Sequence, residues 1–169
     1  MAPILLAVPI LIATYRRFPL TPLAYRLIFL HALVLMVGGH YTYARVPAGF
    51  WLQDLLGLAR NPYDRFGHLM QGFVPAILAR EVLRRRTPLR SGGWLLFLVT
   101  SVCLAISAFY ELTEWWTAVA GGAAATDFLG TQGDVWDTQS DMLMALIGAL
   151  GAQLLLARYH DRQLARPGS

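Results

Sequence analysis

The sequence predicts an all-α membrane protein: a bundle of five transmembrane helices, or alternatively four, with a polar cavity open to the non-cytoplasmic side. The first observation is composition, since 56% of the 169 residues are hydrophobic and only 14% are charged, against about 25% charged in a soluble domain. The second is the recurrence of apolar stretches close to the ~20 residues that a membrane-spanning helix needs. The third is that arginines gather at one set of ends of these stretches.

The whole chain, residues 1–169, is expected to form a single integral membrane domain. The predicted spans, in chain order, are residues 3–15, 25–44, 64–84, 93–116 and 137–158. The first is the shortest, so its failure to cross would leave four helices. Residues 49–60 mix apolar and polar positions and predict a short interfacial helix lying on the membrane surface.

The basic residues predict the orientation. Every basic residue is an arginine, and eleven of the fourteen fall at one set of span ends: Arg16, Arg17, Arg26, Arg80, Arg84, Arg85, Arg86, Arg90, Arg158, Arg162 and Arg166. The positive-inside rule places these ends, and with them the C-terminus, in the cytoplasm. No basic face alternates with aromatic residues, so the net charge of +4 does not indicate nucleic-acid binding.

Ionisable residues gather at the opposite ends of the same spans. About 20 residues separate each cytoplasmic arginine cluster from the ionisable residues at the other end of its span. At ~1.5 Å per residue, this distance is one hydrocarbon thickness. Their spacing of three, four or seven residues puts the members of each span on one helix face. The predicted polar core consists of Asp64, His68, Glu111, Asp137 and Asp141, followed by His40 and Glu114, and then by Asp134 and Arg65.

Such residues are costly inside a bilayer, at about 2.5–3.5 kcal/mol for an aspartate at the centre of a span. One hypothesis is a divalent metal held by a subset of His40, His68, Glu111, Glu114, Asp137 and Asp141. A second is metal-free general acid–base catalysis by a histidine–carboxylate pair on a lipid head group. A third is a transporter or binding protein for a cation or small molecule. A purely structural role, with the aspartates capping helices, is the fourth.

The remaining sequence predictions concern two histidines, two glycines and the cytoplasmic halves of the spans. His31 lies deep in its span and is expected to be a hydrogen-bonded packing residue, whereas His160 is expected to be solvated in the cytoplasmic tail. Gly148 and Gly151 predict close helix packing. The cytoplasmic halves of the later spans are almost entirely apolar, which favours a one-sided site over transport across both leaflets.

Four long motifs carry a family resemblance: GGHYTYARVP (38–47), NPYDRFGHLMQGFVPAILARE (61–81), SAFYELTEWW (107–116) and FLGTQGDVWDTQSDM (128–142). With these motifs the chain resembles the bacterial YjdF family of inner-membrane proteins over nearly its whole length, and more distantly the VanZ-like membrane proteins. The resemblance implies a multi-span helical protein of the bacterial inner membrane and supplies no reaction. The leading hypothesis is a site that acts on an envelope lipid or lipid-linked substrate, with or without a divalent metal.

Overall fold

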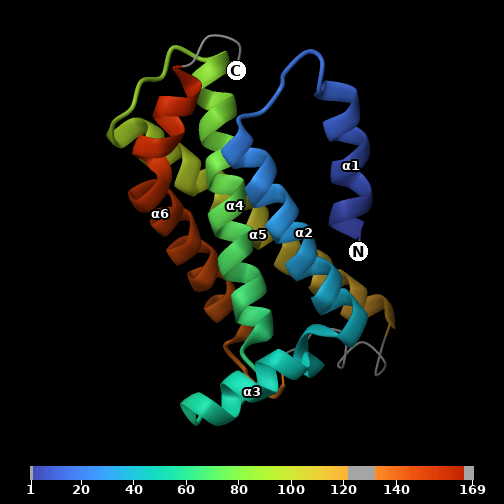
Figure 1. Ribbon diagram of the computed structural model, residues 1–169. Helices are drawn as coiled ribbons and strands as arrows, with labels where there is room; N and C mark the ends of the chain where they lie inside the picture. The colour runs from blue at the N-terminus through green and yellow to red at the C-terminus, as the bar shows by residue number, and fades with distance from the viewer. Residues whose placement is uncertain (1, 122–131, 166–169) are drawn as a thin grey trace.

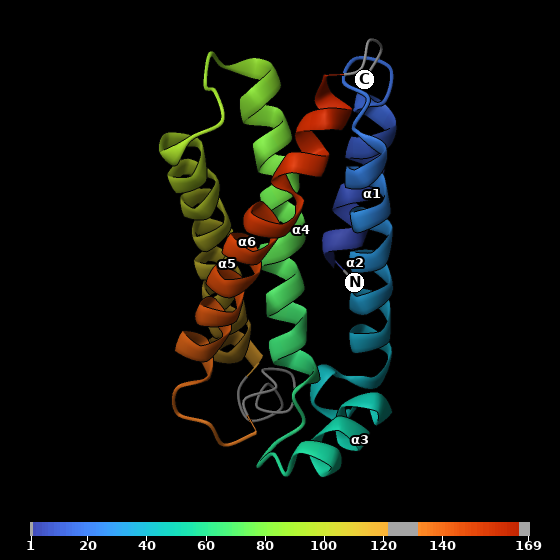
Figure 2. The same ribbon diagram turned by 60° about the vertical axis from the view of Figure 1, so that its left-hand side comes forward.

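The computed structural model describes residues 2–121 and 132–165, and this part of the chain is helical without strands. Its elements are α1 (Ala2–Thr14), α2 (Pro22–Tyr41), the 3-10 turn η1 (Tyr43–Arg45), α3 (Pro47–Leu56), α4 (Tyr63–Arg86), α5 (Gly93–Gly121) and α6 (Asp137–Leu164). Helices α2, α4, α5 and α6 form a bundle with α4 in its middle (Figures 1 and 2). The predicted all-α class is therefore confirmed.

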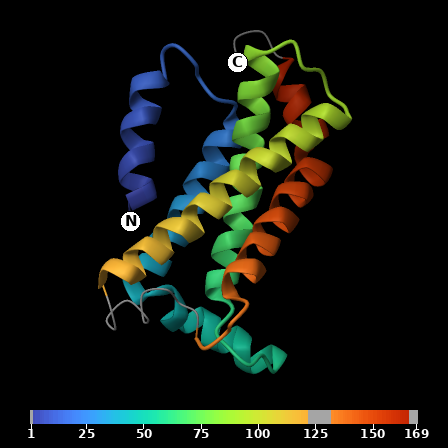
Figure 3. The same cartoon turned by 180° about the vertical axis from the view of Figure 1, so that it is seen from behind.

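The two remaining α-helices lie outside this bundle. Helix α3 lies across one end of it, where α2 ends and α4 and α6 begin, and α1 stands beside α2 (Figure 1). Helix α3 ends at Gly57, whose φ of 61° is left-handed and closes the helix. In Figure 3, which views the bundle from behind, α5 crosses obliquely in front of α4.

Within the described part of the chain, three helices, α2, α5 and α6, are long and apolar enough to cross a membrane. Helix α1 is apolar but has only 13 residues. Helix α4 has 24 residues and is less hydrophobic, because it carries ionisable groups near both ends. Neighbouring helices cover these groups, and Asp64, His68, Arg80 and Glu81 are all buried. The central position of α4 thus shields its ionisable groups inside the bundle.

Helices α4 and α6 run in the same direction and approach closely because two glycines remove side chains at their crossing. A Cβ on Gly72 would lie 1.9 Å from the backbone oxygen of Ala145, and one on Gly148 would lie 2.0 Å from that of Leu69. Gly151 has open space around it, so it does not share the packing role predicted for both glycines. One turn before the Gly72–Ala145 contact, the same register sets His68 beside Asp141.

An apolar core fills the middle of the bundle between its two polar ends. It is built by the inner faces of α2, α4, α5 and α6, with Leu23, Leu27, Val74, Ala76, Ile77, Leu95, Val99, Cys103, Ala149 and Ala152 as its buried members. Cys103 is a free, buried thiol in this core, which agrees with a packing role.

Candidate functional site

His68 is the centre of a buried polar cluster formed by three helices. Its Nε2 lies 3.9 Å from Asp64 Oδ1 on the preceding turn of α4 and 3.8 Å from Asp141 Oδ2 on α6. Its Nδ1 faces the other way, 3.5 Å from Glu111 Oε1 on α5. The two ring nitrogens therefore face different carboxylates, and we refer to Asp64, His68, Glu111 and Asp141 as the His68 cluster.

The His68 cluster is closed to solvent and incompletely hydrogen-bonded. His68 is 3% exposed and Asp141 is 1% exposed. Three of the buried polar atoms have no hydrogen-bond partner: His68 Nδ1, Glu111 Oε1 and Asp141 Oδ1. Leaving such atoms unsatisfied costs about 1–3 kcal/mol each, and more for charged groups. A cluster of this kind is suited to a ligand, an ion or ordered water that completes its bonding.

The cluster includes a plausible set of metal ligands. One atom each from Asp64, His68 and Asp141 lie within 4.8 Å of one another, and all three residues are buried. An imidazole with carboxylates is the donor set that zinc, manganese and iron accept. Glu111 lies on the opposite side of the imidazole, where a carboxylate typically fixes the ring and its tautomer in metal sites.

Two arginines bind the aspartates at the rim of the cluster. Arg60 contacts Asp137 directly, and its Nη1 lies 3.4 Å from Asp134 Oδ2. Arg65 Nη2 lies 2.5 Å from the same Asp134 oxygen. Asp137 is thus paired with an arginine instead of joining the three-residue ligand set, although the spacing of the sequence placed it in the same stripe as Asp141. Arg60 Nη2 also lies 3.8 Å from Asp64 Oδ2, so one rim arginine reaches a carboxylate of the His68 cluster itself.

Asp134 also helps to begin α6. Its Oδ1 accepts a hydrogen bond of 2.9 Å from the backbone N–H of Trp136. This bond, with the guanidinium groups of Arg65 and Arg60, holds the pKa of the Asp134 carboxyl below its usual range. Asp134 therefore stays ionised and anchors the segment that positions Asp137 and Asp141.

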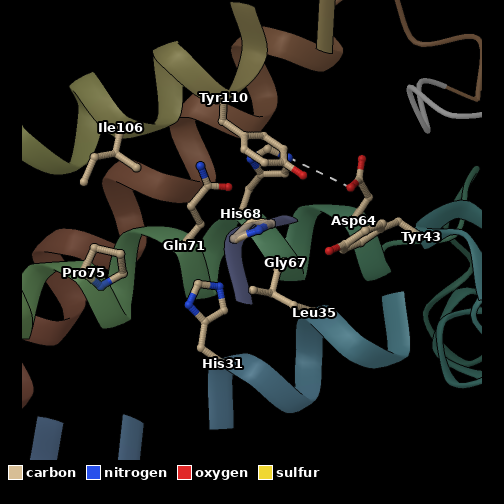
Figure 4. A pocket seen from close by; sticks show the side chains of 11 residues that line it. His31, Leu35, Tyr43, Asp64, Gly67, His68, Gln71, Pro75, Ile106 and Tyr110 are labelled. Carbon is tan, nitrogen blue, oxygen red and sulfur yellow. Dashed lines mark ion pairs between the residues drawn. The ribbon is translucent and has the colours of Figure 1, made fainter. Parts of the chain in front are cut away.

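Two tyrosines that the spacing analysis did not select cover the cluster. The Tyr110 ring packs edge-on against His68 with centroids 5.8 Å apart. Tyr43 enters from the η1 turn, where Gly38 and Gly67 make room for its ring. Tyr110 was detectable as the neighbour of Glu111, whereas Tyr43 follows a helix end and obeys no helical spacing. Both rings are shown beside His68 and Asp64 in Figure 4.

Two of the predicted site residues, His40 and Glu114, do not belong to the His68 cluster. His40 is exposed, and its ring contacts Tyr41 instead of a carboxylate. The reason is rotational: Gly38 faces the bundle, and a residue two positions later lies about 200° around the helix. Glu114 is partly buried one turn beyond Glu111 and is close enough to Tyr43 for an electrostatic interaction.

A cavity of about 190 Å³ opens from the His68 cluster toward the middle of the bundle. Its polar end is formed by Tyr43, Asp64, His68 and Tyr110, and its other walls by Pro3, His31, Leu35, Gly67, Gln71, Pro75 and Ile106. Figure 4 shows α4 running between α5 and α2, with Ile106 and Tyr110 on α5 and His31 and Leu35 on α2. His31 Nε2 has no hydrogen-bond partner here, so the expectation of a hydrogen-bonded packing histidine is not met.

The opposite end of the bundle contains a second buried polar network, which sequence reasoning missed. The Glu81 carboxylate accepts hydrogen bonds from the Thr21 N–H, the Thr21 hydroxyl and Arg85, at 2.9, 2.7 and 2.9 Å. His160 Nε2 lies 3.0 Å from the same carboxylate. Both Glu81 and His160 are 0% exposed, so the expectation that His160 is solvated is wrong.

This network joins the start of α2 to α4 and α6. Arg80 contacts His160 Nδ1 at 3.1 Å and Asp161 at 2.8 Å. A guanidinium can only donate, so Nδ1 is the acceptor and the proton of a neutral His160 lies on Nε2, facing Glu81. The Glu81 carboxylate and both ring nitrogens of His160 have hydrogen-bond partners, in contrast to the unpartnered atoms of the His68 cluster, whereas Asp161 Oδ1 lacks one and lies 3.8 Å from Arg84 Nη2. The signal in the sequence was the position of Glu81, four residues before Arg85.

Comparison with known proteins agrees with the membrane architecture. Residues 1–162 match a family described as "Predicted membrane protein (DUF2238)". The chain is 61% identical over 166 residues to the inner membrane protein YjdF of Escherichia coli strain K12, an alignment that covers 98% of this chain and 79% of that protein. No solved structure matches the chain. The chain therefore belongs to the DUF2238 family of predicted membrane proteins, and the resemblance drawn from its motifs is confirmed.

Proposed function

We propose that the chain is a five-helix inner-membrane protein whose His68 cluster binds a divalent metal in the outer leaflet and acts on the head group of an envelope lipid or lipid-linked substrate. The observation that carries the proposal is that the two ring nitrogens of His68 face different carboxylates. Its Nε2 faces Asp64 and Asp141, while its Nδ1 faces Glu111. A carboxylate behind a metal-binding histidine is a common arrangement in metal sites.

The arginines support the orientation. The bundle end with the Glu81 network carries Arg84, Arg85 and Arg86 at the end of α4, which the positive-inside rule places in the cytoplasm together with the C-terminus. The His68 cluster is at the opposite end of α4 and α6, on the non-cytoplasmic side. Helix α3 lies across that end and exposes Trp51, Leu55 and Leu56, as expected of a helix in the membrane interface.

The count of five spans includes α1 and α4. The polar residues of α4 are covered by three neighbouring helices, so the helix can cross without exposing them to lipid. Helix α1 is short, and its exposed Leu5, Leu6 and Ile12 suit contact with hydrocarbon. A short span of this kind is accommodated by local thinning of the bilayer or by flanking arginines that reach the interface.

The chemistry follows from the donor set. A bound divalent ion would polarise a phosphoryl oxygen or lower the pKa of a bound water toward neutrality. Glu111 would hold the His68 ring, and Tyr43 and Tyr110 would exclude bulk water from the site. The rim arginines, Arg60 and Arg65, are placed to neutralise aspartates and to attract an anionic head group.

Transport of a cation is the weaker alternative. A transporter needs a polar path through both leaflets. Between the His68 cluster and the Glu81 network lies the apolar core around Val74, Ile77 and Val99, each no more than 1% exposed. The network beyond that core is internally hydrogen-bonded. These features favour a site that is entered from one side.

Metal analysis of the purified protein tests the proposal. Protein in detergent micelles is expected to bind one equivalent of Zn²⁺, Mn²⁺ or Fe²⁺, and His68→Ala and Asp141→Asn are expected to lose it. His40→Ala is the matched control, because it removes an exposed imidazole from the same end of the bundle. Thermal unfolding of each variant separates loss of the metal from loss of the fold.

Two results would contradict the metal site. One is the absence of stoichiometric metal both before and after incubation with each of the three ions. The other is equal metal loss in His68→Ala and His40→Ala. The lipid part is tested separately, by incubating the metal-loaded protein with vesicles of bacterial lipid extract and detecting new lipid species by mass spectrometry, with Glu111→Gln as the inactive comparison.

A further inference from the structure

The cavity below the His68 cluster has one polar end and an otherwise mostly apolar lining. Asp64, His68 and Tyr43 form the polar end, and Leu35, Pro75 and Ile106 are among the residues that form the rest. From Asp64 to Pro75, eleven residues along α4 correspond to about 16 Å, or roughly half of a ~30 Å hydrocarbon layer. The cavity therefore runs from the level of the lipid head groups to about the middle of the membrane.

A membrane lipid has the same arrangement as this cavity, with a polar end at the membrane surface and an apolar part toward the bilayer centre. A lipid in the outer leaflet has its phosphate at the interface and its alkyl chain pointing toward the bilayer centre. We propose, on the basis of the function proposed above, that this cavity holds one alkyl chain of a phosphate-bearing lipid while its head group reaches the His68 cluster. This proposal extends the proposed function by naming where the alkyl chain of the substrate binds and which residues contact it.

The cavity lies between α2 and α5, which make few close contacts with each other, and Pro3 of α1 also borders it. Ile106, on its wall, is 42% exposed, and the neighbouring outward side chains Phe29, Leu33 and Phe109 are exposed and apolar. Figure 4 shows α2 and α5 on opposite sides, with α4 running between them. A chain can thus enter sideways from the bilayer, without the head group first crossing water.

The volume limits what fits. About 190 Å³ corresponds to roughly six groups the size of water or a methylene, at ~30 Å³ each. That is room for part of a single chain and not for two chains side by side. The second chain of a two-chain lipid would stay in the bilayer, so the site would select by head group and by one chain.

Gly67 is the position at which the cavity can be narrowed with the least disturbance. It lines the cavity, and an added Cβ would meet the Tyr43 ring alone, at ordinary contact distances of 3.4 Å to Cε1 and 3.7 Å to Cδ1. Gly67→Ala is thus expected to fold and to narrow the cavity, and Gly67→Leu to fill it. Gly151 is the matched control, since it is also a helical glycine and an added Cβ there meets nothing within 4 Å.

The experiment is photolabelling in phosphatidylcholine vesicles that contain phosphatidic acid with a diazirine halfway along one alkyl chain. Saturable labelling is expected on the peptides that carry Leu35, Pro75 or Ile106. Gly67→Leu is expected to lose this labelling, Gly67→Ala to weaken it, and Gly151→Leu to retain it. Size-exclusion chromatography and thermal unfolding verify the fold of each variant, and Gly67→Ala keeps the test decisive if Gly67→Leu is unstable.

The outcomes separate this inference from the function on which it rests. Labelling spread evenly over exposed faces of α1 and α5, or unchanged by both Gly67 variants, would overturn the alkyl-chain site. Loss of metal in His68→Ala with intact labelling would support both proposals and show that the alkyl chain binds without the metal. Absence of metal binding in the wild type, with saturable cavity labelling, would refute the proposed metal chemistry alone.

Discussion

The buried Glu81 network allows a prediction of large magnitude at a position far from the candidate site. Glu81→Gln keeps the size of the side chain and removes its charge. The four groups that face the carboxylate, namely two from Thr21, one from Arg85 and Nε2 of His160, all lie 2.7–3.0 Å from its oxygens. A glutamine offers one acceptor oxygen and must present an NH₂ group to the rest.

Either orientation of the amide leaves donors facing donors. An NH₂ group on the His160 side opposes the Nε2 proton, and a change of tautomer would turn the Nδ1 proton toward Arg80. An NH₂ group on the other side opposes Arg85 and the Thr21 N–H. Either orientation loses at least one of these bonds, and the bonds that remain reach a neutral side chain instead of a carboxylate. We therefore expect destabilisation of about 3–5 kcal/mol, the range for breaking a buried charge pair.

The assay is thermal unfolding in detergent, measured by the fraction of protein that elutes as a monodisperse peak after heating. At about 2–4 °C per kcal/mol for a chain of this size, the midpoint should fall by roughly 10 °C. Asp54→Asn is the control, because it removes an equal charge from an exposed position on α3. A midpoint within about 2 °C of wild type, or an equal fall in Asp54→Asn, would refute the network as a source of stability.

Two further predictions concern packing and pH. Gly148→Ala places a Cβ 2.0 Å from the backbone oxygen of Leu69 and should destabilise the folded protein by about 1–3 kcal/mol. Gly151→Ala meets no neighbour and should stabilise the helix by about 0.5–1 kcal/mol. Unfolding midpoints of the two variants that move in the same direction would contradict the assigned α4–α6 crossing. Because the pKa of Asp134 is lowered in the folded protein, its contribution to stability is present above the unfolded pKa of about 3.9 and disappears as pH falls through the lower folded value. The difference in melting midpoint between wild type and Asp134→Asn should therefore shrink below about pH 4, and a difference that is constant from neutral to acidic pH would exclude an ionised Asp134 as its cause.

The local pattern of the sequence predicted several parts of the site before any tertiary information. Asp64 and His68 share a helix face because they are four residues apart, and Asp141 falls in the same stripe as Asp137 for a similar reason. The cost of charges in lipid then argued that the polar stripes of different helices face a common interior. The structure does place His68, Asp64, Asp141 and Glu111 together.

Spacing could not predict the contacts that depend on rotation or on loops. His40 is at the right depth but on the wrong side of α2, since depth depends on residue count and facing depends on how the helix is packed. Tyr43 reaches the cluster from a 3-10 turn, where helical periodicity does not apply. The pairing of Arg60 with Asp137 joins a loop to the start of α6, and neither residue carries a local signal for the other.

Composition, hydrophobic length and arginine placement are properties of the chain taken one segment at a time. They determined an all-helical membrane protein in which most acidic residues lie at the helix ends opposite the eleven clustered arginines. Only the tertiary structure decided which of those residues meet. Two glycines bring α4 and α6 into backbone contact and set the register that puts His68 beside Asp141. The same packing buries Glu81 against His160, a pair 79 residues apart in the chain. Such contacts depend on the mutual rotation and approach of helices, which are fixed by the fit of whole surfaces and not by the periodicity of any single segment.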